Sequence, residues 1–165
     1  MITYGEQTDP PVGGIDCYEG ITLTIGKYCS IASGLKIYSG THPCIDHPKV
    51  VSTFPFKERW NADYPPSKMG GQVTIGNDVW IATDVRILEG ITIGDGAIIG
   101  AGSIIGSDVP PYTIAIGNPW KVLRKRFTDK QIKKLLEIKW WDFPKEIIER
   151  TLWSMKDIDE FLKNY

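Results

Sequence analysis

Residues 73–106 read VTIGNDVWIATDVRILEGITIGDGAIIGAGSIIG, and this stretch decides the fold. Isoleucine recurs in it at every sixth position, at 75, 81, 87, 93, 99 and 105. The residue two places before each isoleucine is apolar or small: Val73, Val79, Val85, Ile91, Ala97 and Ser103. Because residues i and i+2 share one face of a strand, each six-residue unit offers a two-residue inward stripe. Such a repeat predicts an all-β solenoid, the parallel β-helix.

Small and turn-forming residues separate the stripes, as in Gly76-Asn77-Asp78 and Gly94-Asp95-Gly96. With three six-residue units per coil, isoleucines 18 residues apart lie above one another, with a rise of about 4.8 Å per coil. The predicted stacked pairs are Ile93 over Ile75, Ile99 over Ile81, and Ile105 over Ile87.

The same spacing begins near the N-terminus at Ile15 and Ile21, and it resumes after a slip of four residues at Ile25, Ile31 and Ile37. Residues 1–14 are polar and rich in proline and glycine, which predicts an irregular leading segment. From Ile37 to Ile75 the gap of 38 residues is not a multiple of six. We therefore expect residues from about 43 to 70, rich in proline and aromatic side chains, to leave the coil as an extended loop. Loops of this length inside compact domains are usually functional.

Beyond Gly106 the six-residue repeat fades and a helical pattern takes over. Thr128 and Gln131 have the spacing of a helix capping box, and apolar residues at helical spacing follow them. A second helix is expected to begin at Pro144, and a last short helix follows it. The expected organisation is a β-helix domain over residues 1–127 and a C-terminal α-helical segment over residues 128–165.

Composition narrows the class of protein. The 19 Lys and Arg residues nearly balance the 20 Asp and Glu residues, so the net charge of −1 gives no bulk attraction to nucleic acid or anionic membranes. The three cysteines, at 17, 29 and 44, form no CxxC pair and no disulfide framework is expected. No apolar run approaches the roughly 20 residues of a membrane span. We expect a cytoplasmic protein without a nucleic-acid partner or a membrane span.

Several motifs together resemble those of the hexapeptide-repeat acyltransferases, and most of all their xenobiotic acetyltransferase branch. They are the hexads themselves, Thr41-His42-Pro43, residues 52–56 (STFPF), residues 77–81 (NDVWI), residues 117–121 (GNPWK) with residues 124–127 (RKRF), and Trp140-Trp141. The resemblance covers roughly residues 15–145. It implies a left-handed parallel β-helix, a homotrimer with active sites between subunits, and acetyl transfer from acetyl-coenzyme A. The handedness comes from the resemblance alone, since most parallel crossovers are right-handed.

His42 is the candidate catalytic residue. Acetyl transfer to a hydroxyl or amine needs a base for the acceptor proton, and imidazole, with an ordinary pKa of about 6.5, can accept one at pH 7. The catalytic histidine of the family maps to the triplet that contains His42, while the alternative role is to cap a turn. His47 is the only other histidine of the sequence, so a zinc site of three histidines cannot form and no metal is expected.

Trp80 lies between the inward Val79 and Ile81, so strand alternation turns its indole outward. The resemblance places this tryptophan beside the thioester and pantetheine of coenzyme A, and a contact between subunits is the alternative. By motif matching, the other coenzyme A contacts fall at Thr83, Ala101, Gly106, Ser107, Lys121 and Arg124. The two cationic positions suit phosphate groups, whereas Lys125 and Arg126 are equally well explained as a solvated charge run.

The acceptor is expected to be a small molecule that is or contains a sugar, such as an activated or surface-polysaccharide sugar. The loop offers aromatic side chains for it at Tyr38, Phe54, Phe56, Trp60 and Tyr64, and hydrogen-bond acceptors at Asp46, Glu58 and Asp63. At least one of Phe54 and Phe56 is expected to anchor the loop to the solenoid wall instead. Two other functions stay open: an antibiotic-inactivating acetyltransferase of the chloramphenicol and streptogramin type, and a non-catalytic structural β-helix.

Overall fold

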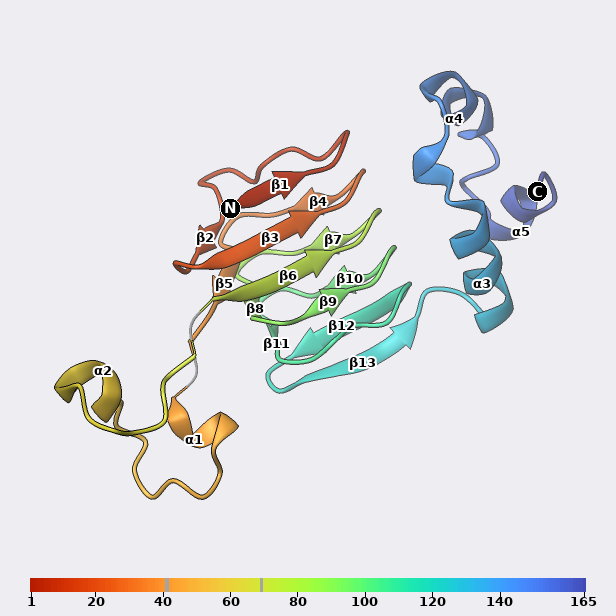
Figure 1. Cartoon of the computed structure of the whole chain (residues 1–165). Coiled ribbons are helices and arrows are strands. Elements are labelled where there is room, and N and C mark those ends of the chain that lie inside the picture. The colour runs from red at the N-terminus through yellow and green to blue at the C-terminus, as the bar shows by residue number, and fades with distance from the viewer. Residues whose placement is uncertain (41, 69) are drawn as a thin grey trace.

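Three sheets of stacked strands form the walls of a coil (Figure 1), in a computed structural model that describes residues 1–40, 42–68 and 70–165. In spatial order, the first sheet contains β1 (Ile2–Tyr4), β3 (Ile21–Ile25), β6 (Gly71–Ile75) and β9 (Thr92–Ile93). The second contains β4 (Ser30–Ile31), β7 (Trp80–Ile81), β10 (Ile98–Ile99), β12 (Thr113–Gly117) and β13 (Trp120–Lys125). The third contains β2 (Asp16–Cys17), β5 (Lys36–Tyr38), β8 (Arg86–Leu88) and β11 (Ile104–Ile105). From β3 to β11 the chain visits the three sheets in turn, which makes the coil a parallel β-helix.

The strand register confirms the predicted stacking of isoleucines. Within the parallel pairs, Ile75 lies opposite Ile93, Ile81 opposite Ile99, and Ile87 opposite Ile105. One coil lower the partners are 50 residues apart in sequence, as in the pair Ile25 and Ile75, because the excursion of the chain lies between them. The coil is therefore continuous below and above the excursion. The exception to parallel pairing is β13, which runs antiparallel to β12.

The inward stripes form the core of the coil. Most of these side chains are fully buried, among them Leu23, Leu35, Ile37, Val73, Ile75, Val79, Ile81, Val85, Ile87, Ile93, Ile99 and Ile105. Burying each large aliphatic side chain contributes roughly 1.5–3 kcal/mol. Ser103 is a polar member of the stripe, and its hydroxyl is paired: Oγ donates to the carbonyl of Gly100 at 2.6 Å and accepts from the amide of Gly117 at 2.9 Å.

The leading segment is more regular than the sequence predicts. Residues 2–4 form β1, which pairs with β3 in parallel, with Ile2 opposite Leu23 and Tyr4 opposite Ile25. Ile2 and Tyr4 are partly buried and pack against the core. The expectation of an irregular segment over residues 1–14 is therefore wrong at its start, because the edge of the first sheet supplies the hydrogen bonds that the local sequence pattern does not reveal.

The excursion leaves the coil after β5 and returns to it at β6, and it projects to one side of the stack (Figure 1). It carries the short helices α1 (Pro43–Asp46) and α2 (Phe56–Trp60). Its aromatic side chains pack on one another, since the ring of Phe56 lies 4.7–5.1 Å from those of Phe54, Trp60 and Tyr64. Phe54 and Phe56 thus stabilise the excursion from within, whereas the sequence analysis expects at least one of them on the solenoid wall.

The C-terminal helices lie on the side of the coil opposite to the excursion (Figure 1). They are α3 (Asp129–Ile138), the 3₁₀ turn η1 (Trp140–Asp142), α4 (Lys145–Thr151) and α5 (Ile158–Leu162). Thr128 and Gln131 form a capping box at the start of α3. A second apolar cluster, built on Tyr112, Ile132, Leu135, Trp141 and Phe161, joins the helices to this side of the coil. In the described part of the chain, no helix is long and apolar enough to cross a membrane.

Candidate functional site

His42 lies at the foot of the excursion, on an exposed part of the chain. Its Nδ1 atom donates a hydrogen bond to the carbonyl oxygen of Thr53 at 2.7 Å. A carbonyl oxygen only accepts, so the neutral ring carries its proton on Nδ1 and keeps the lone pair of Nε2 free. The geometry therefore leaves His42 able to take up a proton from a ligand through Nε2.

A hollow of about 370 Å³ opens beside His42, and its walls come from both ends of the excursion. The lining residues are Ser39, Gly40, His42, Pro55, Glu58, Arg59 and Ser67. Apart from Gly40 and Pro55, every lining side chain is polar or charged. Most of the surface that these residues turn toward the hollow is nevertheless apolar, so the hollow offers a ligand both apolar contact and hydrogen-bond partners.

Glu58 is fixed in this hollow as a carboxylate. One of its oxygens accepts a hydrogen bond from the amide of Ser67 at 2.8 Å, and this bond is the largest cause that lowers the pKa of Glu58. Glu58 is among the contacts to the acceptor that are predicted from the sequence, whereas Ser39, Arg59 and Ser67 are not. Their spacing carries no pattern, because residues from 39 to 67 meet only after the excursion has folded back.

The other residues of the excursion that the sequence analysis names lie elsewhere. Asp46 and His47 border a separate hollow with Val50 and Pro65. Tyr38 stacks on Tyr18 with ring centroids 5.2 Å apart. Thr41, the first residue of the triplet that contains His42, is outside the described residues. Among the residues that are described, no group of three or more histidine, cysteine, aspartate and glutamate side chains gathers as a metal site.

Trp80 points outward, as strand alternation predicts: its side chain is 51% exposed, while Val79 and Ile81 are buried. In the second sheet it lies opposite Ile98 of β10, Ile98 lies opposite Ile114 of β12, and Ile114 lies opposite Arg124 of β13. Trp80 and Arg124 thus share one outer face, three strand spacings or roughly 14 Å apart. Lys121 is exposed on the same edge strand, opposite Ile116.

Thr83 and Ala101 occupy stacked turns at the corner that follows the second sheet. The amide of Gly102 donates to the carbonyl of Thr83 at 2.9 Å, and the Thr83 hydroxyl donates to the carbonyl of Ser33 one coil lower at 3.1 Å. Gly106 and Ser107 lie beyond β11, at the corner that follows the third sheet. This is also the corner from which the excursion and His42 leave the coil.

Within one chain, the predicted site residues therefore lie in two separate places. His42 shares a corner with Gly106 and Ser107, whereas Trp80, Thr83, Ala101, Lys121 and Arg124 lie on the second sheet and at the corner after it. The basic run of β13 divides as well: Lys125 and Arg126 form ion pairs with Asp129 and Asp78. Within the described chain Lys121 and Arg124 form no ion pair, so their charges are available to a ligand.

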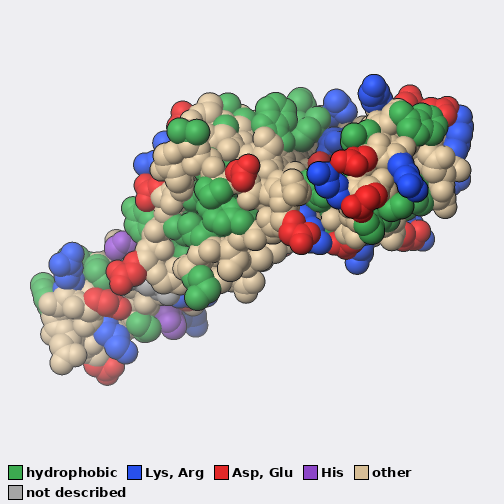
Figure 2. Space-filling view, turned by 90° about the horizontal axis from the view of Figure 1, so that it is seen from above, with side chains coloured by type: hydrophobic (Ala, Val, Ile, Leu, Met, Phe, Trp, Pro, Cys, Tyr) green, Lys and Arg blue, Asp and Glu red, His purple; other side chains and the backbone are tan. Residues whose placement is uncertain are grey.

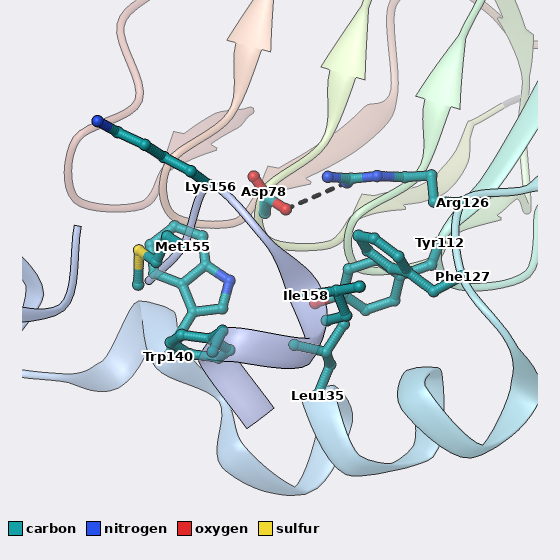
Figure 3. Close-up of a pocket in the computed structure, with 10 residues that line it drawn as sticks. Asp78, Tyr112, Arg126, Phe127, Leu135, Trp140, Met155, Lys156 and Ile158 are labelled. Carbon is teal, nitrogen blue, oxygen red and sulfur yellow. Dashed lines mark hydrogen bonds and ion pairs between the residues drawn. The ribbon is translucent and has the colours of Figure 1, made fainter. Parts of the chain in front are cut away.

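A second cavity, of about 260 Å³, lies between the coil and the C-terminal helices (Figure 3). Arg126 crosses it, donating to Asp78 at 3.3 Å and to the carbonyl of Gly96 at 2.7 Å, with its guanidinium 5.3 Å from the rings of Tyr112 and Phe127. Burial is the main cause that raises the pKa of Asp78 and that of Tyr112. None of the predicted site residues lines this cavity. Its apolar lining residues all belong to the cluster that joins the C-terminal helices to the coil, so we interpret it as a gap in that packing.

Comparisons with known proteins agree on one family. Residues 72–107 match the model of the bacterial transferase hexapeptide family, described as six repeats. A probable macrolide acetyltransferase of Lysinibacillus sphaericus is 38% identical over 88% of this chain and 85% of its own length. A chloramphenicol acetyltransferase of Agrobacterium fabrum is 44% identical over 79% of this chain, which spans 64% of that relative.

A solved galactoside acetyltransferase in complex with coenzyme A superposes with a TM-score of 0.54 and 27% sequence identity, covering 78% of this chain and 60% of that chain. The matched repeat, the stacked coil and the extent of the likeness to the macrolide acetyltransferase all point the same way. Together they establish that this chain belongs to the hexapeptide-repeat family of acetyltransferases.

Proposed function

We propose that this chain transfers an acetyl group from acetyl-coenzyme A directly to a hydroxyl or amine of a sugar or sugar-containing small molecule, with His42 as general base. The observation that carries the proposal is the 2.7 Å hydrogen bond from His42 Nδ1 to the carbonyl of Thr53. It orients the ring and leaves Nε2 facing outward as the acceptor of a proton. The hydrogen-bonding groups of Ser39, Glu58 and Ser67 in the neighbouring hollow support an acceptor that carries hydroxyl groups.

In the proposed reaction His42 Nε2 takes the proton from the acceptor hydroxyl as the acceptor oxygen attacks the thioester carbonyl. The new C–O bond forms, the C–S bond breaks, and the thiolate of coenzyme A leaves. The imidazolium then returns its proton to the thiolate, so the products are the acetyl ester and the free thiol. General-base catalysis of this kind contributes about 10²–10⁴-fold to the rate.

Coenzyme A is proposed to lie along the outer face of the second sheet. Trp80 supplies a flat apolar surface for the pantetheine, and Thr83 and Ala101 lie beside it on the same chain. Gly106 and Ser107 are proposed to contact it from the corner that holds His42, on a neighbouring copy of the chain. Lys121 and Arg124 bind its phosphate groups. The coenzyme A complex of the galactoside acetyltransferase supports this choice of acetyl donor.

We propose a homotrimer with its sites between subunits, and the division of these residues between two places on one chain supports a shared site. If a second copy of the chain presents its outer sheet face to the corner that holds His42, base and coenzyme A meet between subunits. The polar excursion then closes the acceptor side of each site. We infer the left-handed sense of the coil from membership of the family.

An antibiotic acceptor is the second candidate function. Two relatives favour it: a probable macrolide acetyltransferase with 38% identity and a chloramphenicol acetyltransferase with 44% identity. We place the sugar first because the hydroxyl, carboxylate and guanidinium groups beside His42 can hydrogen-bond the hydroxyl groups of a sugar.

The test is thiol release from acetyl-coenzyme A by the purified chain with maltose, a galactoside, glucosamine, chloramphenicol and a macrolide as acceptors, with the acetylated product identified by mass. We expect turnover with a sugar-containing acceptor. The variant His42→Ala should lower kcat by about 10²–10⁴-fold. His47→Ala is the matched control, since this second histidine of the excursion borders a different hollow. Equal rates for wild type and His42→Ala with every productive acceptor would refute the role of His42.

A further inference from the structure

The two ends of the excursion are joined by one side chain. Ser39 is the first residue after β5, and Gly70 is the last before β6. The hydroxyl of Ser39 accepts a hydrogen bond from the amide of Gly70 at 2.7 Å and donates one to Oε2 of Glu89 at 2.6 Å. We call Ser39, Gly70 and Glu89 the clasp. Both hydrogen bonds and all three residues are partly buried.

The clasp rests on a tightly packed stack of turns. A Cβ on Gly70 would lie 2.8 Å from the carbonyl oxygen of Gly20 on the coil below, and Gly70 has a φ of +81°. A Cβ on Gly71 would lie 3.0 Å from the Cβ of Glu89 on the coil above. The returning end of the excursion therefore has almost no room to move, and Glu89 ties the departing end to it through Ser39.

The bond from Ser39 to Glu89 has the length expected when a hydroxyl donates to a carboxylate, about 2.5–2.7 Å. Such charge-assisted bonds are roughly twice as strong as neutral ones. The order of donors is also fixed: the amide of Gly70 can only donate, so Ser39 must turn its own proton toward Glu89. Removing the carboxylate thus loosens both bonds of the clasp.

The clasp lies close to His42, the proposed base. His42 follows Ser39 by three residues, and both line the same hollow. Two contacts fix the chain around His42: the clasp before it and the hydrogen bond to the Thr53 carbonyl after it. Since a displacement of about 1 Å can cost 10²-fold in rate, the geometry of the first contact matters to the chemistry.

We propose that Glu89 is a positioning residue for His42, acting through Ser39 and touching no substrate. This inference rests on the proposed function, because it assigns Glu89 to the support of the proposed base. Nothing in the six-residue repeat marks Glu89, which occupies a turn position between the inward Ile87 and Ile91. The inference depends on the folded clasp alone.

Glu89→Ala should lower kcat by about 10- to 100-fold while the KM for acetyl-coenzyme A changes much less, since Glu89 is not among the proposed coenzyme A contacts. Glu89→Gln keeps a hydrogen-bond acceptor and should recover most of the lost rate. Ser39→Ala should show the same loss of kcat as Glu89→Ala. Asp157→Ala is the matched control: it removes a carboxylate that caps α5 on the far side of the coil, where Asp157 accepts from two amides at 2.9 and 3.0 Å. It should lower the thermal midpoint and leave kcat unchanged.

The deciding measurement is a double-mutant cycle with His42→Ala. If Glu89 acts through His42, then the variant with both substitutions is no slower than His42→Ala alone. If the decreases in kcat of the two single variants multiply in the double variant, Glu89 acts independently of His42 and the proposal is wrong. A fully active Glu89→Ala variant would also overturn it. Ser39→Ala takes the place of Glu89→Ala in the cycle if the latter does not fold. Wild-type activity of His42→Ala would instead refute the proposed function, so the two failures are distinguishable.

Discussion

Ser103 illustrates, at the scale of one residue, how the inner stripe tolerates a hydroxyl. The side chain is fully buried, yet it satisfies the carbonyl of Gly100 and the amide of Gly117 at once. A buried polar group is costly only when it lacks a partner. Ser103 therefore links the third sheet to the end of β12 as well as filling its place in the repeat.

The first prediction concerns this pair of bonds. Ser103→Ala makes the stripe more apolar, but it leaves the amide of Gly117 without its partner and should lower the free energy of unfolding by about 1–3 kcal/mol. Urea denaturation followed by circular dichroism measures the change. Ser30→Ala, an exposed serine of β4, is the control and should change stability little. An increase in stability for Ser103→Ala would contradict the prediction.

At the scale of elements, the turns of the coil are the places where an added side chain has the least room. Gly96, in the turn between β9 and β10, has a φ of +67°, and a Cβ there would lie 2.4 Å from Cε1 of Tyr112. Tyr112 belongs to the cluster that holds the C-terminal helices. The turn and the helices are therefore coupled through one close contact. The division of the chain after residue 127 stays a prediction, although β13 ends at Lys125 and α3 begins at Asp129.

The second prediction compares two glycines with the same backbone conformation. Gly102 has a φ of +68°, but a Cβ there meets no atom within 4 Å. Gly102→Ala should cost about 1–2 kcal/mol for the left-handed conformation alone. Gly96→Ala should cost about 1–3 kcal/mol more, because Tyr112 must move. Equal losses of unfolding free energy would show that the contact with Tyr112 adjusts without cost.

At the scale of the whole molecule, the excursion and the C-terminal helices extend the coil in opposite directions (Figure 2), and both histidines lie on the lobe formed by the excursion. The predicted coenzyme A contacts on the second sheet lie apart from that lobe. We therefore propose that an active site combining the two is formed by different copies of the chain.

The third prediction tests this arrangement by mixing two inactive variants. His42→Ala lacks the proposed base, and a chain with Lys121→Ala and Arg124→Ala lacks the proposed phosphate contacts. In trimers assembled from equal amounts of both, about a quarter of the sites between subunits contain only intact residues, given cyclic symmetry. Recovery of activity on co-expression is expected, together with a trimeric mass by light scattering. No recovery from an assembled mixture would place the whole site within one subunit.

Much of the coil could be predicted from sequence, because its pattern is local and repeats. Isoleucines 18 residues apart are stacked as expected, and Trp80 points outward, since a strand alternates its faces whatever surrounds it. Strand β1 escaped prediction because a three-residue segment at a sheet edge has too few residues to show a period. The course of the excursion escaped it as well, since its aromatic residues pack on each other.

The sequence by itself determined the coil and its register, because both depend on residue types at short, regular spacing. It also supplied His42 as the candidate base, through the resemblance of its triplet to that of the family and because the chain has only two histidines. Only the tertiary structure decided what surrounds His42. Ser39, Glu58 and Ser67 reach one hollow from different parts of the excursion, and Glu89 reaches the clasp from the next coil. These contacts join residues up to 50 positions apart. They depend on how a long loop closes on a rigid wall, and no local pattern encodes that closure.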